Sequence, residues 1–131
     1  MDDAPVKRQS IEIDGFRHRG PLPGASKVGP LVESSIIVPV NPGTRDLPDT
    51  FEEQAANLFS HVGAMLTAAG GGWDNLVKLT FFVADAAEGR AKLNEPWLEL
   101  FPDPATRPAR HTIEDDPGES KVTCVFTAYI P

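Results

Sequence analysis

The sequence predicts one α+β domain in which two helices cover one face of a β-sheet and leave the other face open. Three observations support this prediction. The chain has 131 residues, which is close to the commonest size of a single domain. Its elements read, in order, as strands, a helix, a strand, a second helix and two closing strands. Each helix crosses over between strands, so both are expected on one face, and the bare face of apolar strands predicts an oligomer interface.

The first third of the chain is expected to hold two strands separated by turns. Residues 1–9 are polar and are expected to fray. Ser10 to Ile13 alternates polar and apolar side chains, which favours a short strand. Residues 20–24, Gly-Pro-Leu-Pro-Gly, cannot continue a sheet ladder. Residues 31–40 are dense in β-branched and aliphatic side chains and predict a buried strand that ends at Asn41-Pro42-Gly43.

The first helix is expected over Thr50 to Ala69. Thr50 and Glu53 have the spacing of a capping box, which satisfies free amide groups at a helix start. Glycines at 70–72 are expected to end the helix, since glycine accepts the left-handed conformation found there. One apolar stripe at helical spacing predicts the buried face: Phe51, Ala55, Leu58, Val62, Met65 and Ala69.

The second helix is expected over Ala86 to Phe101. Pro96 predicts either a kink or a fresh start, because proline lacks an amide donor and clashes with the preceding turn. The proposed buried side of this helix consists of Ala87, Ala91, Asn94, Leu98 and Phe101.

Three strands are expected in the second half of the chain. Leu76 to Ala84 precedes the second helix, and its apolar face is predicted to be Val77, Leu79, Phe81 and Val83. Ala109 to Glu114 and Lys121 to Ile130 follow that helix and are joined by the polar turn at residues 115–118.

Composition excludes some classes of function. Twelve basic and nineteen acidic residues give a formal charge of −7, which disfavours nucleic-acid binding because such binding uses Lys and Arg to displace counterions from phosphates. No apolar run approaches the roughly 20 residues that span a bilayer, and the acidic start lacks the features of a secretory signal. The single cysteine, Cys124, cannot form an intrachain disulfide. A cytoplasmic protein with no membrane or nucleic-acid partner is expected.

Several local motifs, taken in order, resemble the YjgF/RidA family. The resemblance covers roughly residues 15–130 and depends on order and spacing, because no single motif is specific. The matching segments are Gly20-Pro21, Asn41-Pro42 after Pro39, Ala68-Ala69-Gly70 followed by Leu76-Val77-Lys78-Leu79-Thr80, Asn94 three residues before Trp97, and Pro108-Ala109-Arg110.

The resemblance implies a fold, an assembly and a reaction. The implied fold is chorismate-mutase-like, with a six-stranded mixed sheet, and three chains form a homotrimer around a central barrel. Ligand clefts lie between subunits. In the best-known branch, water adds to a 2-imino or 2-enamino acid and releases ammonia and a 2-keto acid. No cofactor is implied.

Two positions depart from the family pattern. Leu22 replaces the tyrosine that follows the Gly-Pro pair, and Thr123 replaces the last-strand glutamate that handles the attacking water. The resemblance therefore leaves three readings open: an imine or enamine deaminase, which includes pathway-specific enzymes such as those acting on aminomuconate; a non-catalytic binder of small acids; and, as the weakest, a ribonuclease.

Arg110 is the main candidate for binding a substrate carboxylate. A guanidinium offers a planar fork of donors that matches a carboxylate and stays charged when partly buried. The alternative is an ordinary surface ion pair. Asn94, Trp97 and Ser35 are candidates to line the same cleft; for Trp97 the alternative is simple core packing, and for Ser35 a hydroxyl bonded to backbone.

The remaining polar candidates have weaker support. His18 precedes the Gly-Pro turn, where an imidazole could act as acid or base, and His61 is expected to be structural or solvent-facing. Thr123 could hold water but cannot act as a base near neutral pH. Glu114 lies about 13 Å along the strand from Arg110, too far for direct cooperation. The histidines lack metal-ligand spacing, so no metal is expected.

Overall fold

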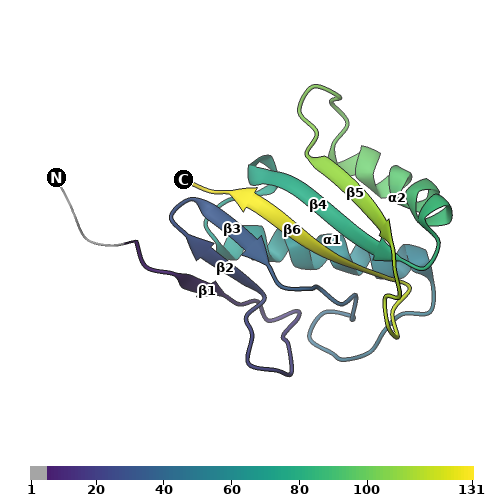
Figure 1. Ribbon diagram of the computed structural model, residues 1–131, viewed down its shortest axis with the longest axis horizontal. Helices are drawn as coiled ribbons and strands as arrows, with labels where there is room; N and C mark the ends of the chain where they lie inside the picture. Colours follow the sequence, from purple (N-terminus) through teal and green to yellow (C-terminus); the bar gives the residue numbers. More distant parts are fainter. Residues whose placement is uncertain (1–5) are drawn as a thin grey trace.

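The computed structural model describes residues 6–131 and shows a six-stranded mixed sheet with two helices on one face (Figure 1). This confirms the predicted fold class. Residues 1–5, part of the segment expected to fray, lie outside the described residues. The strand order is β1-β2-β3-β6-β4-β5. The strands are β1 (Gln9–Ile11), β2 (Ala25–Val28), β3 (Leu31–Ser34), β4 (Leu76–Val83), β5 (Ala109–Glu114) and β6 (Val122–Tyr129), and the helices are α1 (Phe51–Ala68), α2 (Ala86–Leu100) and a 3-10 turn at Trp73–Asn75.

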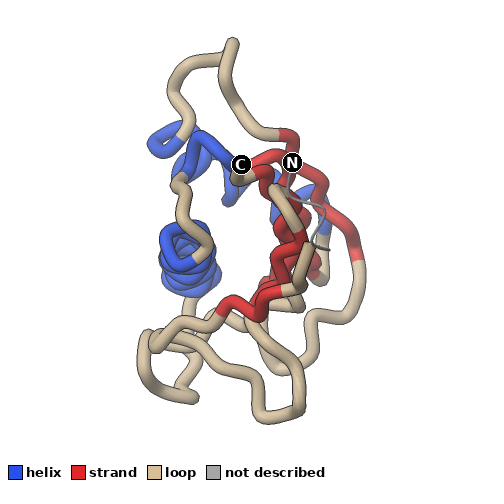
Figure 2. Tube along the Cα trace, turned by 90° about the vertical axis from the view of Figure 1, so that its left-hand side faces the viewer, coloured by secondary structure: helices blue, strands red, loops and turns tan. Residues whose placement is uncertain are grey.

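The hydrophobic core lies between the sheet and the helices. Figure 2 shows the molecule edge-on, with both helices on one side of the strands. On β4 and β6, alternate side chains face this core and are buried: Leu79, Phe81 and Val83 from β4, and Val122, Cys124, Phe126 and Ala128 from β6. The other face of the sheet has no covering layer within the described chain.

Helix α1 follows the sequence prediction closely. The Thr50 hydroxyl accepts a hydrogen bond from the Glu53 amide (3.1 Å) and donates one to the Glu53 carboxylate (2.8 Å). All six residues of the predicted stripe are buried. At the other end Gly70 adopts φ +95°, and the Gly71 amide donates to the carbonyl of Leu66 (2.9 Å). These bonds satisfy backbone groups that a helix end would otherwise leave free.

Helix α2 buries a different face from the predicted one. It runs through Pro96 without ending, and its buried residues are Gly89, Leu93 and Trp97. Of the predicted stripe only Phe101 is buried; the exposed members are Ala87, Ala91, Asn94 and Leu98. Alanine tolerates either environment, so the large Trp97 and Leu93 decide the orientation. Gly89 permits it, because a Cβ there would lie 2.8 Å from a methyl of Val83 on β4.

The N-terminal strands differ from the prediction in number and length. Strand β2, Ala25–Val28, had no clear sequence signal, since it is four residues long and includes Ser26 and Lys27. The predicted strand over 31–40 pairs regularly only as far as Ser34, and then makes one isolated bridge from Ile37 to Cys124. Pro39 cannot donate to a ladder, which is consistent with an irregular segment there.

Strand β4 begins with a β-bulge. The register with β6 shifts between Leu76 and Lys78, so Val77 is an extra residue on the bulged strand. Val77 is 48% exposed, whereas Leu79, Phe81 and Val83 are buried. The prediction that Val77 shares their face is therefore wrong, because a bulge breaks the two-residue alternation.

The two closing strands are separated in the sheet. β4 lies between them, antiparallel to β6 and parallel to β5, so the turn at 115–118 crosses past β4. This topology makes β5 an edge strand, bordered on its inner side by β4 and on the helix side by α2.

His61 is a buried polar residue of α1 and ties the helix to the segment that follows β3. Its Nε2 lies 2.8 Å from the carbonyl oxygen of Val40, and its ring lies 5.6 Å from that of Phe16. Burial lowers the pKa of His61 below its ordinary value of 6.5, so the neutral ring with a proton on Nε2 fits this place. The structural interpretation of His61 is thus supported.

Acidification should destabilise the fold through His61. Because the pKa of His61 is lowered in the folded chain, the unfolded chain binds more protons as the pH falls below 6.5. The contribution of the neutral His61 to the free energy of unfolding is therefore complete above pH 6.5 and is lost as the pH falls toward the folded pKa. Urea unfolding from about pH 7.5 to about pH 5.5 should show a falling free energy. His61→Gln should flatten that slope, and the exposed-residue control His111→Gln should keep it; equal slopes in both variants would refute this role.

Candidate functional site

Arg110 lies on the edge strand β5, on the side that the helices cover. Its backbone is in register with Leu79 of β4, a residue that faces the core. Neighbouring residues in register share a face of a sheet, so the side chain of Arg110 extends toward α2 rather than into the open face. The edge position leaves one side of the guanidinium without a neighbouring strand.

Asn94 and Trp97 of α2 hold the guanidinium in place. The Nη2 of Arg110 donates a hydrogen bond of 2.8 Å to Oδ1 of Asn94, and its Cζ lies 5.2 Å from the centre of the Trp97 ring. Trp97 is 7% exposed and packs edge-on against Phe101, with 4.7 Å between ring centres. Trp97 is therefore both a core residue and the platform on which the cation rests.

One nitrogen of Arg110 is shielded from solvent and has no partner among residues 6–131. This atom is Nη1, and the hydroxyl of Thr112, two residues along the same face of β5, is in the same state. No carboxylate of the described chain lies within 4.0 Å of the guanidinium, so the surface ion-pair alternative is not observed. Burial, and then the nearby positive charge of Arg90, lower the pKa of Arg110. An anion bound here would stabilise the charged form of Arg110 and so oppose both of these effects on its pKa.

Thr123 lies on the opposite side of the sheet from Arg110. It is in register with Phe82, whereas its neighbour Cys124 is in register with Phe81 and faces the core. Thr123 is thus buried within the open face, where it is 6% exposed. Arg110 and Thr123 of one chain cannot contact the same small ligand from these positions.

Ser35 and Leu22 are also remote from Arg110 within the chain. Ser35 follows β3, which β6 and β4 separate from β5, a distance of roughly 14 Å across the sheet. Its amide donates to the carbonyl of Gly24 (2.9 Å). Leu22 lies exposed in the loop before β2. These two residues share the β1–β3 half of the molecule, at the other side of the sheet from Arg110.

His18 belongs to a third location. It lines a hollow between residues 14–19 and the loop at 38–47, to which Glu119 also contributes. Glu114, by contrast, has a structural partner, because its carboxylate accepts a hydrogen bond from the amide of Ala86 at the start of α2 (3.1 Å). The thiol of Cys124 is buried, which raises its pKa and makes it a poorly reactive core residue.

Comparison with known proteins identifies the family. Residues 16–116 match the family model described as endoribonuclease L-PSP. A RutC family protein of Aquifex aeolicus is 34% identical over 94 residues, which are 72% of this chain and 74% of the relative. The putative reactive intermediate deaminase TdcF of Escherichia coli is 30% identical over 96 residues, again 72% of this chain and 74% of the relative. The chain belongs to the YjgF/RidA family.

A solved structure of the family agrees with this assignment. The crystal structure of RidA from an Antarctic Psychrobacter species superimposes with a TM-score of 0.84 at 30% identity, over 93% of this chain and 99% of the other. The YjgF/RidA fold is therefore confirmed for essentially the whole described chain. Relatives named as reactive intermediate deaminases place the chain among RidA-type imine deaminases at the level of the family.

Sequence reasoning identified three residues that the YjgF/RidA fold brings together and missed two others. Asn94, Trp97 and Arg110 form one cluster. Arg90 and Thr112 complete its surroundings and were not singled out. The signals were available, since Arg90 precedes Asn94 by four residues on the same helix, and Thr112 alternates with Arg110 along a strand. Within residues 6–131, no three of the His, Cys, Asp and Glu side chains group closely enough to hold a metal ion, and neither helix is long and apolar enough to cross a membrane.

Arg110 should be dispensable for stability if it serves a ligand. A half-buried guanidinium with a free nitrogen and a like charge nearby adds little net stability, so Arg110→Gln should change the free energy of unfolding by less than about 1 kcal/mol. Urea denaturation of the ligand-free protein measures this quantity. A loss of about 3 kcal/mol or more would instead make Arg110 a structural residue of the β5–α2 contact.

Proposed function

We propose that the chain hydrolyses a small carboxylated 2-imino or 2-enamino compound and that Arg110 binds its carboxylate. The observation that carries this proposal is the state of Arg110: a guanidinium fixed by Asn94 and Trp97, partly desolvated, with a shielded nitrogen that has no partner in the described chain. A carboxylate supplies two acceptor oxygens of matching geometry. The names of relatives support a deaminase rather than another carboxylate-binding protein.

The residues of the cluster have separate roles in this proposal. Arg110 binds the carboxylate and withdraws electron density next to the reacting carbon. Asn94 positions the guanidinium and does not touch the substrate through Oδ1, which is already engaged. The face of Trp97 holds the cation from below. Orientation of an already electrophilic C=N carbon supplies much of the catalysis in such a site.

The reaction needs water and a route for protons. The water oxygen bonds to the imine carbon, the carbon–nitrogen bond then breaks, and a carbonyl forms as ammonia leaves with the protons that water supplied. Thr123 of a neighbouring copy of the chain would contribute a hydroxyl that can hold water in place but cannot accept a proton permanently near neutral pH. We therefore assign proton movement to water and to the substrate's own nitrogen.

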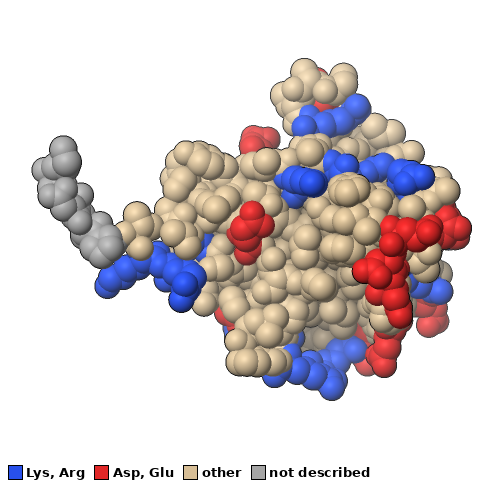
Figure 3. Space-filling model, viewed as in Figure 1, with Lys and Arg blue, Asp and Glu red and all other residues tan. Residues whose placement is uncertain are grey.

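A homotrimer would complete the site. Figure 1 places both helices behind the sheet, so Figure 3, drawn from the same side, shows the open face, whose middle is largely free of charged side chains. Large hydrophobic side chains there are exposed, among them Val28, Leu31, Ile36 and Tyr129. Burying them against other copies is favourable, and it would bring Leu22, Ser35 and Thr123 of one chain toward Arg110 of another. The buried lone thiol agrees with the cytoplasmic location that we include in the proposal.

The second candidate function is non-catalytic binding of a small acid. One observation favours it: within the described chain no carboxylate lies within 4.0 Å of the Arg110 guanidinium and no imidazole forms a hydrogen bond with it, so the cluster has a binding group and no paired base. Ribonuclease activity, which the description of the family model names, is the weakest reading because a chain with a formal charge of −7 repels RNA.

A coupled assay distinguishes catalysis from binding. An amino-acid oxidase generates 2-imino acids, and their disappearance is followed by semicarbazide trapping. The protein should accelerate imine loss, and Arg110→Ala should lower kcat/KM by at least about 30-fold, equivalent to about 2 kcal/mol for losing one partner of a charged hydrogen-bonded pair.

The control in this assay is Arg8→Gln, which removes an exposed arginine outside the site and should act as wild type. Acceleration that survives unchanged in Arg110→Ala would refute the assigned role. No acceleration of any imine, together with saturable binding of 2-keto acids, would favour the non-catalytic candidate.

The trimer is tested by mass in solution. Light scattering behind a sizing column should give about 42 kDa, three times the 14.1 kDa of one chain. Leu31→Glu, on the open face, should dissociate the assembly. Leu98→Glu is a matched control, because Leu98 is similarly exposed but lies on α2. A wild-type mass of one chain, or dissociation by the control alone, would contradict the proposed interface.

A further inference from the structure

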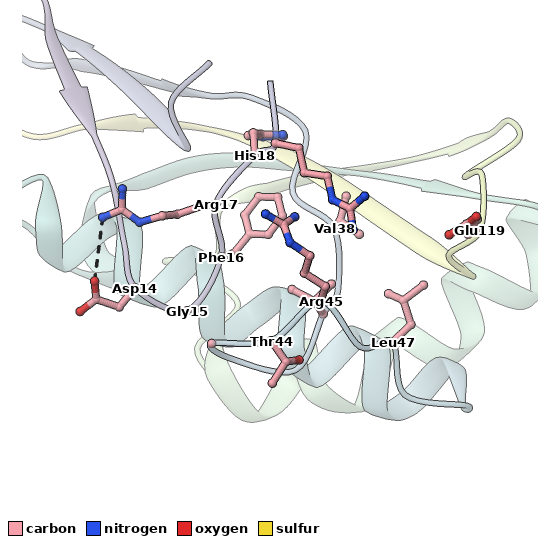
Figure 4. A pocket seen from close by; sticks show the side chains of 13 residues that line it. Asp14, Gly15, Phe16, Arg17, His18, Val38, Thr44, Arg45, Leu47 and Glu119 are labelled. Carbon is pink, nitrogen blue, oxygen red and sulfur yellow. Dashed lines mark ion pairs between the residues drawn. The ribbon is translucent and has the colours of Figure 1, made fainter. Parts of the chain in front are cut away.

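A hollow of about 640 Å³ lies apart from the Arg110 cluster (Figure 4). One wall is the segment Asp14–Arg19, which follows β1. The other is the loop that runs from Val38 to Leu47, and Glu119 of the β5–β6 connection borders the far side. Arg110, Asn94 and Trp97 do not line it.

The walls of the hollow are tied together within the chain. The amide of Gly43 on one wall donates to the carbonyl of Gly15 on the other (2.9 Å). The loop is fixed internally, since the Asn41 amide donates to the Asp46 carbonyl (2.8 Å). The site is therefore built in advance, which lowers the entropic cost of binding.

The floor of the hollow is apolar. Phe16 and Val40 are buried, and Val38 and Leu47 pack partly against the core. Phe16 lies between two imidazoles. The centre of its ring is 5.6 Å from that of His61 and 4.9 Å from that of His18, which it meets edge-on. This surface suits an aliphatic or aromatic body rather than a fully polar ligand.

Three arginines border this floor, and two of them, Arg19 and Arg45, have no anionic partner within the described chain. Arg17 is engaged, with Glu12 at 3.1 Å and Asp14 at 3.9 Å, and Figure 4 shows it turned toward Asp14. Figure 4 also shows Arg45 reaching from the loop toward Phe16. No carboxylate of residues 6–131 lies within 4.0 Å of Arg19 or Arg45, although the chain has nineteen acidic residues.

His18, which lines the hollow, has a ring nitrogen that is shielded from solvent and has no partner within the described chain. This nitrogen is Nε2. A buried polar atom left unpaired destabilises a fold, so a ligand that bonds to it recovers free energy. Arg17 is paired with Glu12 and Asp14, so the lining residues outside this ion-pair group are Arg19, Arg45 and Glu119, which together carry an excess of one positive charge.

We propose that this hollow is a second ligand site that binds a small carboxylate with an apolar body. Arg45 and Arg19 bind the carboxylate, His18 Nε2 forms a hydrogen bond with it, and the body packs on Phe16, Val38 and Leu47. A single negative charge matches the excess charge of the lining, whereas Asp14 and Glu119 disfavour a dianion. This site is independent of the imine chemistry proposed for Arg110.

Three probes of one ring size test the charge preference. Benzoate, phenyl phosphate and benzylamine are titrated into the full-length ¹⁵N-labelled protein. Benzoate should shift the amide signals of Phe16, Val38 and Thr44, and benzylamine should not. Tighter binding of phenyl phosphate than of benzoate, or binding of benzylamine alone, would overturn the assignment to a carboxylate.

Substitutions locate the binding. Arg45→Gln and Arg19→Gln should each weaken benzoate binding at least about tenfold, while Arg110→Gln and Arg8→Gln should leave those shifts unchanged. If benzoate instead shifts the amides at 109–112 and Arg110→Gln abolishes the effect, the ligand belongs to the Arg110 cluster and the second site does not exist. The absence of any shift at Phe16 in wild-type protein would overturn the proposal equally.

Discussion

Both helices pack on the same face of the sheet, and the rest of the molecule depends on this constraint. β4 and β6 are interior strands of the sheet, and their core-facing side chains can be buried only beneath α1 and α2. One consequence is a sheet with an open apolar face. Another is that the edge strand β5 has α2 beside it on one face only, so an arginine at its start is partly desolvated without being enclosed. The packing of both helices on one face thus explains both the open face of the sheet and the partly desolvated state of Arg110.

The guanidinium of Arg110 lacks part of its hydrogen bonding and has no counter-charge within the described chain, and the proposed ligand binding depends on this. Asn94 satisfies one nitrogen of Arg110 with a neutral oxygen, and Trp97 offers the negative face of its ring. Neither partner neutralises the charge, and Arg90 adds to it. A partnering Asp or Glu would have neutralised the guanidinium and closed the cluster to the carboxylate that we propose as its ligand. The same reasoning applies to Arg19 and Arg45, which leave charge uncompensated beside an apolar floor.

Sequence reasoning succeeded where local rules and packing agree. α1 has its cap at Thr50, its stripe and its terminal glycines, and all were predictable. It failed where packing between elements determines the structure, as at the bulge at Val77, in the short β2 and for the buried face of α2. The orientation of α2 follows from Trp97 fitting beside Arg110 and from Gly89 fitting against Val83. Motif spacing correctly grouped Arg110 with Asn94 and Trp97. It could not place Thr123, Ser35, Leu22 and His18, because their relation to Arg110 depends on strand order and on other copies of the chain.

The most direct measurement is NMR of the Arg110 guanidinium in the full-length protein during titration with pyruvate, with methyl pyruvate as the uncharged control. If the free nitrogen binds a carboxylate, pyruvate should shift and slow the rotation of the Arg110 Nη groups, and methyl pyruvate should have no effect. Asn94→Ala should weaken the pyruvate response, because the guanidinium then loses the bond that orients it. No response to saturating pyruvate, or equal responses to both compounds, would contradict the account.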